Sequence, residues 1–159
     1  MDNDYQFVTH WRVEANEATR EEVFDLLADA EGLPRWWPSV YLAVQVLAPG
    51  EPNGVGRVVD LHTRGLLPYT LRWQFRVTEV RRPERMALEA WGDLVGTGIW
   101  TLRDEAGATA ITYDWRVRAE KPLLRLLSPL LKPLFAANHR WAMARGDESL
   151  HRELARRRQ

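Results

Sequence analysis

Five polar side chains in this sequence belong to types that transfer protons, and they occur in segments with an apolar pattern. They are Asp60, His62, Asp93, Asp114 and His139. A carboxyl group or an imidazole that faces a buried cavity serves as a general acid or base, the chemistry that a cyclisation or a dehydration requires. A structural interpretation competes with this one, because Asp60 and His62 share a strand face with Arg64 and form an ordinary charge ladder if that face meets water.

His139 is the most specific of these candidates because of its place in a helical pattern. It shares one stripe with Phe135, Met143 and Leu150, a spacing that turns all four toward the same neighbour. A hydrogen-bonded histidine in an ordinary core fits the same stripe equally well. The catalytic residues therefore stay unassigned, with His139, Asp60 and His62 as weak candidates.

The aromatic residues predict a cavity. Eight of the 159 residues are tryptophan, and a small core rarely needs so many large rings with N–H groups to satisfy. The alternative is that the rings only fill the core, where each contributes about 2–3 kcal/mol of stability with or without a ligand. A pocket of rings with few polar partners favours a flat, hydrophobic ligand. The predicted ligand-binding residues are Trp37, Trp73, Trp100, Tyr113, Trp115, Phe135, His139 and Met143.

The composition and the residue spacing argue against several other classes of functional site. There is no cysteine, which excludes disulfides, zinc–thiolate sites and thiol catalysis. The four histidines lack the spacing of metal-ligand pairs, and no glycine-rich phosphate loop occurs. Basic and acidic residues number 22 each, so the field typical of a nucleic-acid-binding protein is missing. We expect no metal, no cofactor and no nucleic-acid partner.

The ends of the chain carry two further signals. The acidic N-terminus lacks the apolar segment of a secretory signal, and no window is apolar enough for a membrane span, so we expect a cytoplasmic protein. From Lys121 to Arg145 no residue is acidic, and cations alternate with leucines. This segment has two interpretations: peripheral contact with an anionic membrane or a mobile pocket mouth, against leucines docked on the sheet with the cations in water. The oligomeric state stays open.

The elements that must position these residues follow one order: a strand, two short helices, six strands and a long helix. Thr19 and Glu22 form a capping box at the start of the first helix. Two-residue alternation and turn signals predict strands at Tyr5 to Ala15, Val40 to Leu47, Gly56 to Arg64, Tyr69 to Val80, Met86 to Trp91, Gly98 to Arg103 and Thr109 to Arg118. The prediction is an α+β fold, in which a seven-stranded antiparallel sheet curves around a long C-terminal helix within a single domain over residues 1–159.

Two details of this plan bear on the site. A turn at Gly107 places Trp100 opposite Tyr113 and Leu102 opposite Ile111, all on the inner face. The register of the middle strands leaves open which way Trp91, Asp93, Asp60 and His62 face. Gly92, Gly96 and Gly98 are interpreted as turn and bulge positions. Pro129 and Pro133 predict a short first helix and a kink before the main C-terminal helix.

The same element order is that of the helix-grip fold. The sequence resembles the START-like (SRPBCC) superfamily, in particular its polyketide cyclase/dehydrase-like branch. The segments that carry the resemblance are Ala18 to Phe24, Leu33 to Val40, Gly92 to Leu94, Gly96 to Trp100 and Ala108 to Tyr113. None of them is a catalytic signature, so the resemblance implies a pocket and leaves its use open.

Three functions follow from the residues and the resemblance together. The leading hypothesis is non-catalytic binding or transport of a small hydrophobic molecule, lipid-like or polycyclic, between the sheet and the C-terminal helix. The first alternative is a cofactor-free cyclase, aromatase or dehydratase that acts on a polyketide-like substrate. The second is a module that docks on a membrane or a protein. The absence of a catalytic constellation favours binding over catalysis.

Overall fold

The computed structural model describes residues 4–66, 69–119 and 122–158, and the side chains within these ranges except those of residues 4 and 119–132. Strand β1 precedes three short helices, six further strands and one long helix. In chain order they are β1 (Asp4–Val13), α1 (Arg20–Ala28), the 3-10 helix η1 (Ala30–Gly32), α2 (Leu33–Trp36), β2 (Tyr41–Ala48), β3 (Val58–Arg64), β4 (Thr70–Arg81), β5 (Arg85–Gly92), β6 (Leu94–Glu105), β7 (Ala108–Ala119) and α3 (Pro122–Arg157). This is the predicted element order, with the 3-10 helix η1 added to the two predicted short helices.

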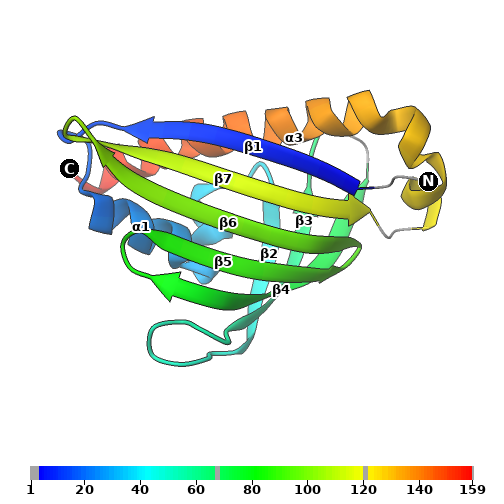
Figure 1. Cartoon of the computed structure of the whole chain (residues 1–159), viewed down its shortest axis with the longest axis horizontal. Coiled ribbons are helices and arrows are strands. Elements are labelled where there is room, and N and C mark those ends of the chain that lie inside the picture. The colour runs from blue at the N-terminus through cyan, green and yellow to red at the C-terminus, as the bar shows by residue number, and fades with distance from the viewer. Residues whose placement is uncertain (1–3, 67–68, 120–121, 159) are drawn as a thin grey trace.

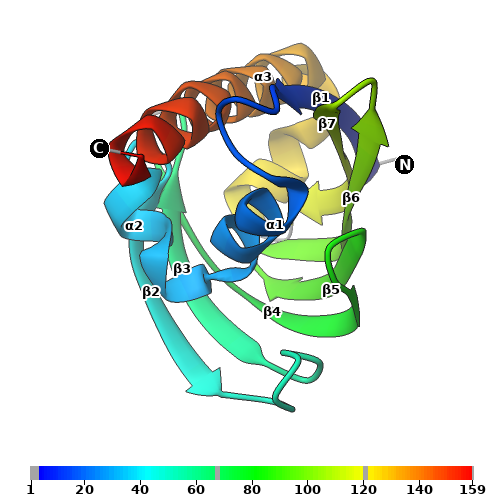
Figure 2. The same ribbon diagram turned by 90° about the vertical axis from the view of Figure 1, so that its left-hand side faces the viewer.

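The described strands form one antiparallel sheet in the order β1-β7-β6-β5-β4-β3-β2. The sheet curls strongly, and α3 lies along its concave side, so that the two enclose a space (Figures 1 and 2). Helices α1 and α2 lie at one end of this space (Figure 2). The predicted helix-grip fold is confirmed.

The register of the last hairpin is as predicted. Trp100 pairs with Tyr113 and Leu102 pairs with Ile111, and all four side chains are buried. The predicted start of the preceding strand is wrong, because β6 begins at Leu94 rather than Gly98. Gly96 is a paired strand residue opposite Val117 instead of a turn residue, whereas Gly92, with φ of 106°, is the last residue of β5, directly before Asp93 and β6.

Of the two helical predictions, the capping box is confirmed and the form of the C-terminal helix is confirmed only in part. At α1, Thr19 Oγ1 accepts a hydrogen bond from the Glu22 amide, and Glu22 accepts one from the Thr19 amide, which completes the capping box. The predicted separate first helix is wrong, because α3 runs without a break from Pro122 to Arg157. The first turns of α3 nevertheless bend away from the axis of the remainder (Figure 1), as the two prolines predict.

The C-terminal part of α3 is held by tight packing and by charges. Leu150 is 0% and Leu154 is 2% exposed. The buried carboxylate of Glu153 accepts hydrogen bonds from Arg156, Arg35 and Arg157, with N···O distances of 2.7 to 2.9 Å. These three guanidinium groups, Arg156 most of all, hold the pKa of Glu153 well below its ordinary value. This contact ties α3 to α2 through Arg35.

Candidate ligand-binding cavity

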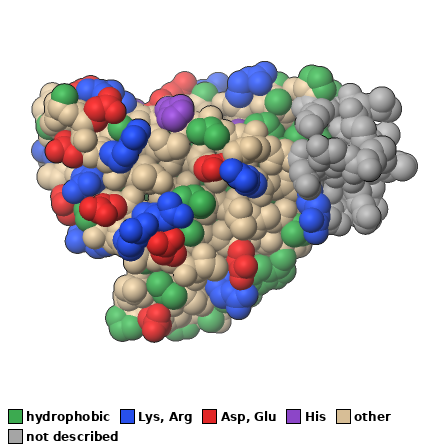
Figure 3. All heavy atoms as spheres, in the orientation of Figure 1, with side chains coloured by type: hydrophobic (Ala, Val, Ile, Leu, Met, Phe, Trp, Pro, Cys, Tyr) green, Lys and Arg blue, Asp and Glu red, His purple; other side chains and the backbone are tan. Residues whose placement is uncertain are grey.

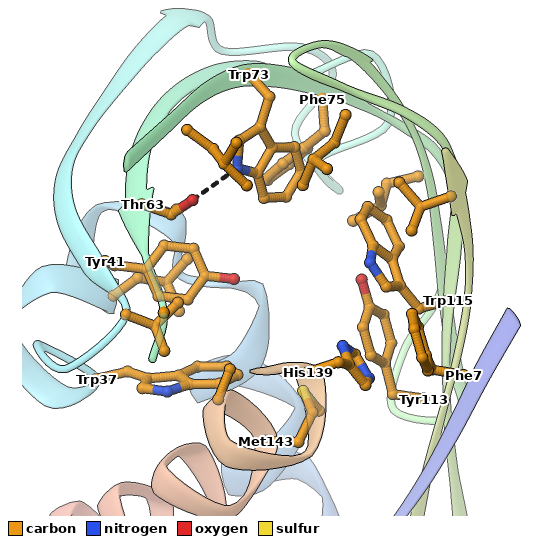
Figure 4. A pocket seen from close by; sticks show the side chains of 18 of the residues that line it. Phe7, Trp37, Tyr41, Thr63, Trp73, Phe75, Tyr113, Trp115, His139 and Met143 are labelled. Atoms are coloured by element: carbon orange, nitrogen blue, oxygen red, sulfur yellow. Dashed lines mark hydrogen bonds between the residues drawn. The ribbon is translucent and has the colours of Figure 1, made fainter. Parts of the chain in front are cut away.

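A cavity of about 190 Å³ lies between the concave face of the sheet and α3 (Figure 4). Its lining side chains come from β1, from the end of α1 through to the first residue of β2, from β3 to β7 and the loops beside them, and from one stretch of α3. All eight residues predicted to bind ligand line this cavity: Trp37, Trp73, Trp100, Tyr113, Trp115, Phe135, His139 and Met143. The structure thus brings the predicted set together in one place.

Aromatic rings contact one another around the cavity wall. Trp100 stacks on Tyr113 with ring centroids 4.1 Å apart, and Trp115 lies 5.6 Å from Trp73. The contacts continue through a second layer, so that successive rings lie within 6.3 Å in the order Tyr41, Trp37, Trp11, Trp100, Tyr113, Trp115, Trp73 and Phe75. Such a wall offers flat faces and edges, the geometry that aromatic ligands prefer.

Two glycines make room for these rings. Gly146 of α3 faces Trp37, and a Cβ atom at this position would overlap the indole ring. On β6, a Cβ at Gly98 would lie 2.7 Å from the hydroxyl oxygen of Tyr113 and 3.0 Å from the Trp115 ring. The absence of a side chain at these two glycines therefore leaves the space that the rings occupy. The sequence-based interpretation of Gly98 as a turn or bulge position missed this role.

Several lining residues were not in the predicted set. Phe7 and Phe75 belong to the inner faces of alternating strands, so the two-residue period of those strands already pointed to them. Thr63 lies on the inner face of β3, where its Oγ1 accepts a hydrogen bond from Trp73 Nε1 at 3.0 Å (Figure 4). No alternation in the sequence of β2 distinguishes Tyr41. Asn138 of α3 accepts a hydrogen bond from the Leu66 amide, a contact between residues distant in sequence.

His139 is a neutral imidazole on the cavity wall. Its ring stacks on Phe7 with centroids 4.3 Å apart. Within the described part of the chain, the buried Nε2 atom has no hydrogen-bond partner. Burial lowers the pKa of His139 from 6.5 to about 4, because a charged imidazolium would lose its hydration without gaining a counter-ion. At neutral pH this side chain therefore presents an uncharged donor or acceptor.

Three of the lining tyrosines supply further uncharged polar groups. Tyr41 and Tyr113 enter the cavity from opposite sides with their hydroxyl groups inward (Figure 4). Burial raises the pKa of both well above 10, and burial raises that of Tyr69 to about 12. All three hydroxyls therefore stay protonated at physiological pH and can donate hydrogen bonds to an oxygen of a ligand.

Three of the other candidates for proton transfer, Asp60, His62 and Asp114, lie outside this cavity. Asp60 and His62 occupy the outer face of β3, opposite Gln74 and Arg72 of β4, and Asp60 accepts a hydrogen bond of 2.5 Å from Gln74. Neither side chain belongs to the lining, so a proton transfer inside the cavity is not supported for either. Asp114 is likewise on the outer face, with Gln6 Nε2 3.4 Å away.

The structure answers the orientation question that the sequence left open for Trp91 and Asp93. Trp91 pairs with Gln74 on the outer face, is 38% exposed and lies beneath the guanidinium of Arg76. Asp93 accepts a hydrogen bond of 2.8 Å from the Arg72 amide, which ties the β5–β6 connection to β4. Both residues therefore have structural contacts away from the cavity.

Charge at the cavity is confined to two arginines. Among the described lining residues none is Asp or Glu, and Arg57 and Arg64 are the cations. Arg57 donates to the carbonyl oxygen of Pro49 at 3.2 Å, and the exposed Arg64 donates to that of Ser39 at 3.3 Å. The outer face differs, because basic and acidic side chains are interspersed over it (Figure 3).

Two other features concern metals and membranes. Within the described residues, no three His, Asp or Glu side chains gather in a way that would hold a metal ion. No helix in that part of the chain has the length and apolarity of a membrane span. The side chains of Lys121, Arg125 and Lys132, which belong to the predicted basic segment, lie outside the described residues.

Comparison with known proteins assigns the family. Residues 8–154 match the family model described as "Polyketide cyclase / dehydrase and lipid transport". The chain belongs to this family. The match covers both the sheet and α3, in agreement with the predicted resemblance to the polyketide cyclase-like branch. No curated protein sequence is detectably similar to this family member.

Solved structures of low sequence identity share the fold. The Zhui aromatase/cyclase from Streptomyces sp. R1128 has a TM-score of 0.73 at 19% identity, with 98% of this chain and 96% of that chain covered. The di-domain ARO/CYC BexL from the BE-7585A biosynthetic pathway has a TM-score of 0.68 at 17% identity, and the covered shares are 93% and 50%. A norcoclaurine synthase from Thalictrum flavum has a TM-score of 0.62 at 13% identity, with 98% and 97% covered.

Proposed function

We propose that this family member binds a small, flat, hydrophobic molecule in the cavity between the sheet and α3, as a binding or transport protein. The observation that carries the proposal is the chemistry of the cavity wall. Aromatic rings form its faces, and its polar groups include protonated tyrosines and an uncharged histidine, with Arg57 and Arg64 as the only charged side chains among the described lining residues. Burying an apolar ligand there releases water from both surfaces without leaving a charge unpaired.

The same wall restricts the ligand. A charged group buried deep in the cavity would meet no counter-ion among the described lining residues other than Arg57 and Arg64, which donate to backbone carbonyls. Hydroxyl or carbonyl oxygens, in contrast, match the hydroxyls of Tyr41 and Tyr113. The ligand class we propose is lipid-like or polycyclic and carries at most a few neutral oxygen groups.

A matched pair of variants on α3 tests this proposal. Ala142 lines the cavity, while Ala144, two residues later, is exposed. Ala142→Phe fills the cavity and should weaken the binding of a neutral polarity-sensitive dye such as Nile red by at least about tenfold. Ala144→Phe adds the same ring to the surface and should leave the affinity unchanged. Equal affinities in the two variants would place the dye elsewhere and refute the proposal.

A second candidate function is a cofactor-free cyclase or dehydratase, and one observation favours it. The Nε2 atom of His139 is a buried, unpartnered proton acceptor or donor within the part of the chain that the structure describes. Two of the proteins compared above are described as aromatase/cyclases. His139→Phe preserves the stacking on Phe7 and removes the imidazole, so turnover of a poly-β-ketone probe that survives this change would exclude His139 as the acid or base.

A further inference from the structure

The cavity reaches the molecular surface where the chain after β3 meets α3. Arg64, the last residue of β3, lines the cavity and is exposed. Two residues later, the amide of Leu66 donates a hydrogen bond of 2.5 Å to Asn138 Oδ1 of α3. Gly65 and Asn138 both belong to the cavity lining. Arg64, Gly65 and Asn138 therefore form a mouth of the cavity, and they bring together two segments that are distant in sequence.

Two exposed leucines lie beside this mouth. Leu66 is 57% and Leu134 is 51% exposed. Leu134 precedes Asn138 by four residues, so it lies one helical turn away on the same side of α3. Neither leucine lines the cavity, so a bound ligand does not cover them. Large apolar side chains that gather beside the opening of an apolar cavity are typical of a surface that meets an apolar partner.

The two segments that meet at the mouth contain no acidic residue. None occurs between Asp60 and Glu79, and none between Glu120 and Asp147, although 22 of the 159 residues are acidic. All side chains in these segments that are charged at neutral pH belong to arginine or lysine. Because the formal net charge of the whole chain is zero, this end of the molecule has more positive charge than the rest.

Three arginines in these segments are available to a partner. Arg64, Arg72 and Arg140 are exposed, and they form no ion pair within the described part of the chain. Asp93, on the neighbouring β5–β6 connection, accepts a hydrogen bond from the backbone amide of Arg72 and leaves its guanidinium group unpaired. The surroundings of the mouth therefore combine apolar side chains with uncompensated cations.

We propose that this mouth docks on an anionic phospholipid membrane, with Leu66 and Leu134 inserted among the lipids. Interfacial binding combines the burial of apolar side chains with the attraction of cations to anionic head groups, and the mouth offers both. The proposal rests on the proposed function in one respect: an apolar ligand can pass between the cavity and the bilayer without crossing water. A soluble acidic protein is the other partner that the charges would fit, and the experiment distinguishes the two.

Co-sedimentation of the full chain with vesicles tests this docking. The wild type should bind vesicles of phosphatidylglycerol at least about tenfold more tightly than vesicles of phosphatidylcholine, and raising the salt from about 0.1 M to 0.5 M should weaken the binding. L66S/L134S removes both apolar side chains without adding a charge and should weaken binding to phosphatidylglycerol by at least about tenfold. V8S/L47S is the matched control, because Val8 is 50% and Leu47 is 55% exposed on strands away from the mouth.

Nile red binding separates this proposal from the proposed function. L66S/L134S should keep the dye affinity of the wild type, because neither leucine lines the cavity. A wild type that binds the dye but no phosphatidylglycerol vesicle would overturn membrane docking and leave the cavity's function intact. Salt-sensitive vesicle binding that L66S/L134S weakens no more than V8S/L47S does would also overturn it. That result would indicate attraction between charges alone, as expected for an acidic protein partner.

Discussion

The two parts of α3 perform different tasks. Between Phe135 and Met143 the helix faces a cavity, and its side chains contact rings across open space. Between Ser149 and Leu154 it is packed against the rest of the core, and the Glu153 carboxylate is fully engaged by arginines. The difference indicates that one part supplies stability while the other borders the cavity. This division is expected where function requires incomplete packing.

The largest expected effect comes from replacing one side chain in each part of α3 by alanine. Leu150 is 0% exposed, so Leu150→Ala should lower the free energy of unfolding by about 3 kcal/mol through lost burial and a new void. Phe135 already borders empty space, and Phe135→Ala should cost only about 1 kcal/mol because few contacts disappear. Urea denaturation measures both values. Equal losses, or a larger loss at Phe135, would contradict the division.

Removing the carboxylate of Glu153 should have the next largest effect. Glu153→Gln leaves Arg35, Arg156 and Arg157 without their shared anion and should lower stability at pH 7 by about 1–2 kcal/mol. Because the pKa of Glu153 is lowered by folding, its contribution is present above the ordinary value of 4.5 and is lost as pH falls toward the folded pKa. The gap between wild type and variant, measured by thermal unfolding, should therefore stay constant above about pH 5 and shrink as the pH falls from 4.5 to 3.

The pH dependence of His139 concerns the cavity part of α3. Burial lowers the pKa of His139 to about 4, so the unfolded chain binds a proton here more readily than the folded chain below pH 6.5. The wild type should lose stability between pH 6.5 and about 4, and His139→Phe should lose less over that range. Titration of the ring by NMR provides an independent check. An imidazole of His139 found charged at pH 6 would contradict a neutral cavity wall.

The smallest expected change in stability is at the contact between Gly146 and Trp37. Gly146→Ala gains about 1 kcal/mol of helix propensity but pushes the Trp37 ring from its position, so the two effects oppose each other. The near-ultraviolet circular dichroism should change more clearly than the stability. In a Trp37→Leu background the same glycine substitution should be stabilising, because the obstructing ring is gone. A destabilising substitution in both backgrounds would show that the ring is not the obstacle.

The sequence predicted the cavity better than the chemistry around it. Alternation along β4 and β7 places Trp73, Tyr113 and Trp115 on one face, because successive side chains of a strand point to opposite faces of the sheet. The outward positions of Asp60 and His62 follow from pairing with β4. That pairing depends on contacts distant in sequence, so it could not be deduced from the strand alone.

Close approach between elements explains what else was missed. The length of β6 was underestimated because Gly96 and Gly98 were interpreted as turn and bulge residues, although the glycine at position 98 clears space for the Tyr113 and Trp115 rings. A glycine in the sequence does not indicate which ring will occupy the space beside it in the fold. The roles of Tyr41 and Asn138 likewise depend on where β2 and α3 meet the cavity.

The most direct test of the central claim is native mass spectrometry of freshly purified protein, followed by denaturing extraction of any bound molecule. The account predicts a reproducible adduct that is released on denaturation, is apolar and uncharged, and is absent from Ala142→Phe but retained by Ala144→Phe. A protein that is repeatedly empty and also fails to take up neutral polycyclic compounds would contradict it. A highly charged adduct would contradict it as well.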